Sequence, residues 1–341
     1  MGIGLSRFSL RMKFNSEKES KVLKIWRGWL IFTINMQVIY EQLLILISTP
    51  LYIIIIGVEL LLSNYRHVKA YTWKDTAANV YLMLLNAFLD ILVRSVYVLV
   101  LAYFFRYQVL SFSNVIVYWV MLLILEDFLY YWLHRFDHEV RLFWAVHVTH
   151  HSSQQLNFSV GFRSSVFQPL YRFIYFIPLA LLGFRPLDIV FIYSATQIWG
   201  IFVHTELIHK MGWLEYILVT PSHHRVHHAS NPKYLDMNMG MFLIVWDKMF
   251  GTFQPELPAS QYQPLKYGLT KAIEKETPIS IVFHEWNSLR KDLLRNDIGW
   301  KQRFYYLFGP PGWSHDGSRK TSKELRQIES GEVDQEGQVA I

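Results

Sequence analysis

The sequence contains no cysteine and few charged residues. Without cysteine there are no disulfides, iron–sulfur clusters, thiolate zinc sites or cysteine nucleophiles. Charged residues make up 18% of the 341 positions, against about 25% in an average soluble domain. Hydrophobic residues make up 52%. This balance predicts an all-α integral membrane protein, in which apolar helices face lipid.

The basic residues exceed the acidic ones, and the formal net charge is +6. They lie mostly at the ends of apolar segments and in the two termini, where anionic lipid headgroups would meet them. Because they are not gathered on a soluble face, we expect no nucleic-acid partner. Residues 1–40 form a basic, amphipathic segment without the pattern of a cleaved signal peptide.

Five apolar runs are candidates for membrane-embedded helices. The first three approach or exceed the length needed to span about 30 Å of hydrocarbon. The last two are marginal in length and are joined by a turn at 183–186, so a hairpin that does not cross fully is an alternative. We therefore expect four to five membrane-embedded helices. The runs are 43–62, 80–105, 114–133, 166–184 and 187–203.

Charge also predicts the orientation. The loop 63–77 carries Arg66, Lys69 and Lys74, and the positive-inside rule places such a loop in the cytoplasm. The ends of the third and fifth runs then return to the same cytosolic face. The basic N-terminus opposes this orientation unless residues 26–40 dip into the membrane and return. We expect a catalytic domain over 41–255, a peripheral segment over 256–315 and a disordered tail over 316–341.

Histidine is concentrated in three boxes. Nine of the fourteen histidines fall in the windows 134–151 and 223–228. Positions i, i+3 and i+4 share one face of a helix, so each box directs two or three imidazoles at one point. Eight converging imidazoles exceed what one tetrahedral zinc needs, and they suit two metals side by side. The boxes are His134 and His138; His147, His150 and His151; and His224, His227 and His228.

The remaining histidines are weaker candidates for metal ligands. His204 lies at the end of the fifth run, beside Glu206, and is a candidate ninth ligand. His223 points about 100° away from His224 on a helix. We interpret the isolated residues as structural or surface side chains; these are His67, His284 and His315.

Two carboxylates near the first box have open roles. Asp127 lies seven residues before His134, so it either orients a ligand imidazole or pairs elsewhere in the bundle. Glu139 follows His138 directly and is either a second-sphere group, a proton acceptor or a surface acid. Beyond the second box, Asn157, Phe158, Phe162 and Arg163 are candidates for lining a substrate entrance.

The chemistry of the ligands limits the choice of metal. An all-histidine site suits iron, zinc or copper better than magnesium or calcium. Two ferrous ions can supply electrons to O2, whereas hydrolysis needs only one zinc and a water. The residues therefore predict a dinuclear oxygenase acting on a lipid. The alternatives are a membrane zinc hydrolase with Glu139 or Glu206 as base, and a metal transporter, although transport ligands lie nearer the midplane.

Longer motifs carry a family resemblance over roughly residues 40–255. The stretch from His134 to Ser153, the run TPSHHRVHH at 220–228 and the run WDKMFGT at 246–252 resemble the fatty acid hydroxylase and sterol desaturase superfamily of membrane di-iron oxygenases. Glu139 after the first box, and the segment from Trp199 to Glu206, are most similar to the alkylglycerol monooxygenase branch. The chain differs from animal members in ending soon after this core.

The resemblance implies that the eight box histidines hold two irons, that O2 is a cosubstrate and that Glu139 is needed for activity. It implies hydroxylation of the carbon beside an ether oxygen, with electrons from a tetrahydropterin. Related members hydroxylate or desaturate sterols and fatty acyl groups, with electrons from a donor protein. The expected location is a membrane, with the active site on the cytoplasmic face: the endoplasmic reticulum in a eukaryote or the inner membrane in a bacterium.

Overall fold

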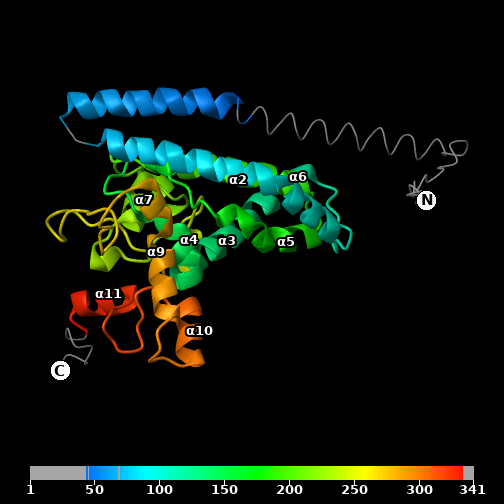
Figure 1. The fold of residues 1–341 in the computed structure, drawn as a ribbon. Helices are drawn as coiled ribbons and strands as arrows, with labels where there is room; N and C mark the ends of the chain where they lie inside the picture. Colours follow the sequence, from blue (N-terminus) through cyan, green and yellow to red (C-terminus); the bar gives the residue numbers. More distant parts are fainter. Residues whose placement is uncertain (1–43, 45, 68–69, 333–341) are drawn as a thin grey trace, which may run out of the picture.

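The computed structural model describes residues 44, 46–67 and 70–332 (Figure 1). The amphipathic segment predicted for 1–40 lies outside this range, as do residues 333–341. Within the described range the chain forms helices and no β-strand, with two isolated bridges. The elements are a helix Leu46–Tyr65, α2 Trp73–Phe105, α3 Val115–Glu139, α4 Arg141–His151, η1 Val160–Phe162, η2 Gln168–Leu170, α5 Phe173–Leu181, α6 Pro186–Phe202, η3 Gly212–Tyr216, α7 Pro221–His228, η4 Pro232–Tyr234, α8 Val245–Phe250, α9 Pro278–Leu293, α10 Trp300–Phe308 and α11 Ser322–Ser330.

Among the described residues, three helices are long and apolar enough to cross a membrane: Leu46–Tyr65, α2 and α3. Their outer faces carry large apolar side chains, and Ile53, Ile91 and Ile116 are 69%, 70% and 71% exposed. An apolar surface of this extent is suited to contact lipid rather than water. The first three predicted runs are therefore confirmed as helices of spanning length.

The fourth and fifth runs fold into shorter helices. Helix α5 has nine residues and α6 has seventeen, whereas about twenty are needed to span the hydrocarbon. Proline interrupts the fourth run at Pro169 and Pro178, and Gly183 turns the chain with a φ of +99°. The two helices pack against each other and against α3. The structure therefore agrees with the alternative of a hairpin that does not cross the membrane fully. Neither α5 nor α6 is long enough to be a candidate for a membrane span.

Helix α2 is longer than a membrane span requires, and its N-terminus lies near the histidine boxes. Its 33 residues measure about 50 Å at 1.5 Å per residue, against about 30 Å of hydrocarbon. Thr72 caps its N-terminus by accepting a hydrogen bond from the Asp75 backbone. The Thr72 backbone N–H donates to Gln155, beyond the second box. The start of α2 and the end of α3 therefore lie at the same end of the bundle, as Figure 1 shows.

The C-terminal segment covers that end. Helix α9 packs on α4, α10 packs on both, and α11 packs on η4 (Figure 1). We predicted a disordered tail from residue 316, but residues 322–330 form α11. Its N-terminus carries a capping box, in which Thr321 and Glu324 exchange hydrogen bonds, and this local signal favours a helix although only Leu325 and Ile328 are apolar. Residues 333–341 lie outside the described range.

Candidate metal centre

Nine histidines meet at the end of the helical bundle. They come from the last turns of α3, from α4, from the segment after α6 and from α7. They form two groups, in each of which one ligand atom per residue lies within 4.8 Å of the others. Group one is His134, His138, His147, His151 and His227, and group two is His150, His204, His224 and His228. These nine residues are those selected from the sequence.

Each of the two short helices contributes to both groups. On α4, His147 and His151 are four residues apart and face group one, while His150 faces group two. On α7, His224 and His228 face group two, while His227 faces group one. One residue of helix turns the side chain by about 100°, so adjacent histidines diverge to neighbouring groups. The groups are in contact, since the rings of His151 and His228 stack with centroids 4.5 Å apart.

Hydrogen bonds fix the tautomer of several rings. A carbonyl oxygen accepts only, so an imidazole Nδ1 bonded to one must carry the proton and leave Nε2 with its lone pair. Four rings have this arrangement and two more bond a serine hydroxyl or a carboxylate. The Nδ1 contacts are His134 to Met239 O at 2.7 Å, His150 to Arg163 O at 2.9 Å, His204 to Gly200 O at 2.6 Å, His227 to Met237 O at 3.0 Å, His147 to Ser165 Oγ at 2.9 Å and His138 to Asp236 Oδ1 at 3.2 Å.

The Nε2 atoms then point at one another. In group two, the Nε2 atoms of His204, His224 and His228 form a triangle with sides of 2.8, 3.0 and 3.1 Å. His150 Nε2 lies 3.3 Å from His204 Nε2. Both rings carry their proton on Nδ1, so two lone pairs face each other there, and they repel unless a cation lies between them. Nitrogens about 2.0–2.1 Å from a shared metal lie roughly 3 Å apart when they meet near a right angle, so these separations fit a metal.

Group one fits in the same way. His147 Nε2 lies 3.0 Å from His134 Nε2 and 3.2 Å from His151 Nε2. The Nε2 atoms of His138 and His227 are buried and have no hydrogen-bond partner among the described residues. Buried nitrogens of this kind are costly unless a ligand satisfies them. Both donor sets are therefore arranged to hold a metal.

Burial keeps the imidazoles neutral. Burial, together with neighbouring imidazoles, lowers the pKa of His147, His204 and His224 well below 6.5. Burial lowers the pKa of His150 to about 4. Neutral imidazole is the form that binds metal, so at neutral pH these rings need not lose a proton first. Burial and neighbouring imidazoles also lower the pKa of His151, His227 and His228 well below 6.5.

The two carboxylates selected from the sequence lie outside both groups. Both oxygens of Asp127 accept hydrogen bonds, from the Phe242 and Leu243 backbones and from the Trp246 indole. Asp127 therefore links α3 to the segment around α8, so of its two predicted alternatives the structure has the second, in which it pairs elsewhere in the bundle. Glu139 is bound to Arg135 at 2.8 Å and its side chain is 43% exposed, so this geometry does not bring it to the centre.

The remaining predictions about histidines agree with the structure. His223 is hydrogen-bonded within the cap of α7 at Thr220, and it lies outside both groups. His67, His284 and His315 also lie outside them. Of the four residues predicted to line a substrate entrance, Phe162 lines a cavity beside the centre. The other three, Asn157, Phe158 and Arg163, are buried.

Sequence reasoning missed the residues that support the ligands. Asp236 and Ser165 bond His138 and His147, and Asp137 lies 3.8 Å from His147. Arg163 donates to Thr149 O, at the second box. These partners reach the histidines only through tertiary folding, and several are backbone carbonyls, so residue type and spacing carry no signal for them.

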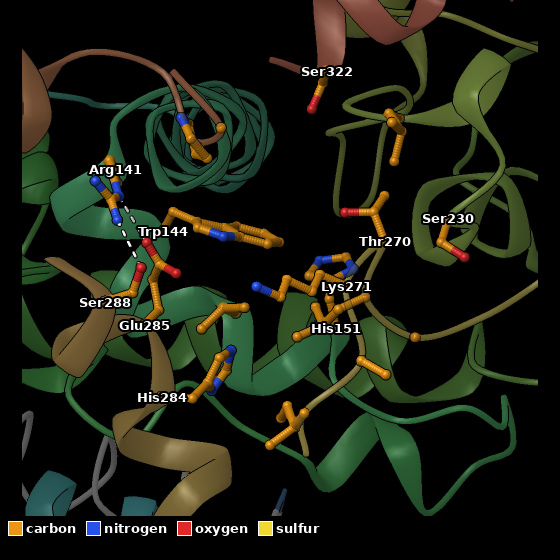
Figure 2. A pocket seen from close by; sticks show the side chains of 18 of the residues that line it. Arg141, Trp144, His151, Ser230, Thr270, Lys271, His284, Glu285, Ser288 and Ser322 are labelled. Carbon is orange, nitrogen blue, oxygen red and sulfur yellow. Dashed lines mark hydrogen bonds and ion pairs between the residues drawn. The ribbon is translucent and has the colours of Figure 1, made fainter. Parts of the chain in front are cut away.

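Two cavities adjoin the centre. The membrane-side cavity, of about 340 Å³, is lined by α2, α3 and α6 and by the start of the first helix. The C-terminal cavity, of about 940 Å³, is lined by α4, α9 and the segments 268–275 and 311–325 (Figure 2). The centre is therefore accessible from two directions.

Comparison with known proteins agrees with the motifs. Residues 119–252 match the family model for fatty acid hydroxylase. The chain is 40% identical over 209 residues to alkylglycerol monooxygenase from Homo sapiens. This alignment covers 61% of the present chain and 45% of the human protein. It is 33% identical over 144 residues to an ornithine lipid hydroxylase from Rhizobium tropici, covering 41% of this chain and 43% of that protein.

A more distant relative is a Delta(7)-sterol 5(6)-desaturase from Gibberella zeae, 25% identical over 147 residues, covering 41% of this chain and 42% of that protein. The chain spans less than half the length of these relatives. No solved structure matches. The matched residues 119–252 include all three histidine boxes, so the resemblance to the fatty acid hydroxylase family is confirmed.

Proposed function

We propose that this chain is a membrane-bound di-iron oxygenase that hydroxylates a C–H bond of a lipid. The observation that supports it most is the pair of adjacent histidine groups with converging Nε2 atoms. Group one offers five imidazoles and group two offers four. Such nitrogen-only sites suit iron, zinc or copper, and two adjacent metal sites exceed what a one-zinc hydrolase needs.

The protein residues would hold and shield the metals. When bound, two irons supply the electrons and the coordination sites that O2 chemistry requires. His204 completes group two from outside the three boxes, so we include it among the ligands. The carbonyl oxygens of Gly200, Met237 and Met239 orient three rings by accepting their Nδ1 protons.

The membrane-side cavity is the proposed lipid site. His134 and His147 from group one, and His150, His204 and His224 from group two, all line it. Its walls come largely from helices that carry lipid-facing surfaces, and they include Phe162, Ile198 and Met241. A lipid chain can therefore reach both groups from the membrane without crossing water.

We propose an ether lipid of the alkylglycerol class as substrate. The support is the 40% identity to a protein named alkylglycerol monooxygenase. The ornithine lipid hydroxylase and the sterol desaturase make another lipid, or a desaturation, the alternative outcomes. In hydroxylation, one oxygen atom of O2 enters the C–H bond. The other leaves as water, with two electrons and two protons from a donor.

We propose that the centre faces the cytoplasm. Basic residues lie where the first helix connects to α2: Arg66 directly follows the first helix, and Lys74 lies in the first turn of α2. Arg163, beside the second box, pairs with Asp75 at the start of α2. This loop and the histidine groups are therefore on the same side, and the positive-inside rule assigns that side to the cytoplasm.

The test is oxygen incorporation by the purified full chain in detergent, loaded with ferrous iron. A 1-O-alkylglycerol is supplied with 18O2 and a two-electron donor, and the product is analysed by mass spectrometry. We expect one labelled oxygen in the product and no reaction of the matched 1-O-acylglycerol at the corresponding carbon. His150→Ala should abolish turnover, whereas His209→Ala, an exposed histidine outside both groups, should not.

Other results point elsewhere. Labelled product from a sterol or a fatty acyl lipid, with none from the alkylglycerol, would retain the oxygenase and replace its substrate. Lipid cleavage that proceeds with zinc and without O2 would contradict the oxygenase and favour a hydrolase.

A further inference from the structure

The membrane-side cavity contains a charged cluster as well as histidines. Asp90 lines it from near the middle of α2, and Arg94 and Arg172 line it beside that carboxylate. On the outer face of the same turn of α2, Phe88 and Ile91 are 58% and 70% exposed, as contact with lipid requires. The three charged groups therefore lie at the depth of the hydrocarbon, where ionisable side chains are costly and commonly mark a functional site.

Asp90 accepts hydrogen bonds from both arginines. Its Oδ2 accepts from Arg94 Nε at 3.2 Å and from Arg94 Nη2 at 3.0 Å, and its Oδ1 accepts from Arg172. The Arg172 guanidinium also lies over the Tyr193 ring, 4.5 Å from its centroid. These contacts join α2 to the start of α5. Because apolar residues often join two elements at least as well as a buried ion pair does, this joining role does not by itself explain the charges.

The walls of the cavity have unused hydrogen-bonding groups. Arg172 has five N–H donors, and within the described part of the chain its side chain donates to Asp90 alone. Gln197, on α6, lines the same cavity, and its buried Nε2 has no hydrogen-bond partner among the described residues. A carboxylate oxygen has two lone pairs, so Asp90 Oδ1 can accept once more. The cavity therefore offers a ligand more donors than acceptors.

We propose that Asp90, Arg172 and Gln197 form a headgroup subsite, which binds the hydroxyl groups of a neutral polyol lipid such as a glycerol ether. A hydroxyl accepts two hydrogen bonds and donates one, so it can accept from Arg172 or Gln197 while it donates to Asp90. Like charges repel across a binding site, so the arginines disfavour an ammonium headgroup and Asp90 disfavours a phosphate. The inference rests on the proposed function, which assigns this cavity to the lipid.

The subsite lies close to the histidine groups. Asn86 Nδ2 donates to Ser165 O at 2.9 Å, and the hydroxyl of the same serine bonds His147 Nδ1. Asp90 is four residues further along α2, about 6 Å beyond Asn86. A headgroup bound at Asp90 therefore brings the carbons next to it, rather than the far end of the alkyl chain, to the histidines. The lipid binds with its polar end inside the cavity and below the membrane surface.

The test compares two ligands that share an ether oxygen and an alkyl chain. These are 1-O-hexadecylglycerol, which has two hydroxyls, and methyl hexadecyl ether, which has none. Each competes with tritiated 1-O-hexadecylglycerol for the iron-loaded full chain in nanodiscs, at equal concentration in the bilayer and without O2 or an electron donor. We expect the diol to compete about tenfold more strongly, since hydrogen bonds to charged groups contribute a factor of about that size.

Two variants remove parts of the subsite. Asp90→Asn and Gln197→Leu should each reduce the preference for the diol. The matched control is Asp188→Asn, which weakens a buried carboxylate's pair with Arg185 away from the residues that line the cavity, and it should keep the tenfold preference. A loosened fold weakens the binding of both ligands alike, so their ratio reports recognition of the hydroxyls rather than stability.

Equal competition by the two ligands, or an unchanged ratio in Asp90→Asn or in Gln197→Leu, would overturn the inference. Tighter binding of 1-O-hexadecylglycerol 3-phosphate than of the diol would also overturn it, because the subsite would then bind an anion. Binding is measured without turnover, so a chain without oxygenase activity can still show the preference. Conversely, labelled product from a chain that shows no preference would keep the proposed function and reject the subsite.

Discussion

Arg163 is the side chain whose removal should be most damaging outside the ligands themselves. It is 2% exposed. Its guanidinium pairs with Asp75 Oδ1 at 2.6 Å and also donates to Asn79 Oδ1, Thr149 O and Ser152 Oγ. These contacts join the start of α2 to the end of α4, where the second histidine box lies. Its own carbonyl accepts from His150 Nδ1, so the residue also positions a ring of group two.

The change Arg163→Met keeps an unbranched apolar stem and removes the guanidinium, with its charge and its donors. Breaking a buried ion pair by removing one partner costs about 3–5 kcal/mol. Asp75 keeps hydrogen bonds from Asn79 and Ser153 and its side chain is 18% exposed, so we expect the lower end, about 3 kcal/mol. At about 2–4 °C per kcal/mol for a large domain, the melting temperature should fall by roughly 6–12 °C.

The assay is thermal unfolding of the detergent-purified chain, at one heating rate, with and without bound metal. The matched control is Lys74→Met, which breaks the pair with Glu276, whose side chains are 72% and 35% exposed. Exposed pairs contribute about 0–1 kcal/mol. A melting temperature for Arg163→Met that is no lower than that of Lys74→Met would refute the claim that Arg163 anchors the second box.

Three further substitutions test the geometry. Gly161→Ala places a Cβ 3.2 Å from His204 Nδ1 and 3.1 Å from Ile201 Cα, so metal analysis should show loss mainly from group two; full occupancy of both groups would contradict this placement. Asp127→Asn should lower the melting temperature by about 2–4 °C per kcal/mol lost without changing the metal content, and metal loss at unchanged stability would restore its orienting role. Glu139→Gln removes an exposed pair worth about 0–1 kcal/mol, so stability and metal content should persist; loss of turnover alone would show that Glu139 takes part in catalysis, as the family resemblance implies.

The apolar runs were sufficient to predict the long helices but not the short ones. Helices α2 and α3 contain no proline, and α3 continues through the first box without a break. The first helix, Leu46–Tyr65, also reaches spanning length, because its proline, Pro50, lies near its N-terminus. The fourth run has similar apolar content, yet Pro169, Pro178 and Gly183 divide it. The fifth run forms one helix, α6, of only seventeen residues. Helix α11 was missed because its sequence is polar, and its capping box is a weaker signal than hydrophobic periodicity.

The histidines of the site were predictable from spacing, and their division between the groups was not. The i, i+3, i+4 pattern puts His147, His150 and His151 on one helix face, but it does not say that His150 faces the other group. That division depends on how α4 and α7 pack, which is a tertiary property. The oxygen atoms that orient the rings are mostly backbone carbonyls, such as those of Met237 and Met239, and any residue type supplies these.

The metal content of the purified chain tests the central claim most directly. Iron and zinc are measured per chain in the protein as isolated and in two single variants, His227→Ala in group one and His224→Ala in group two. The account predicts two irons per chain, and about one iron in each variant if the groups bind independently. One zinc per chain, or the same metal content in all three proteins, would contradict a two-metal centre built from these two groups.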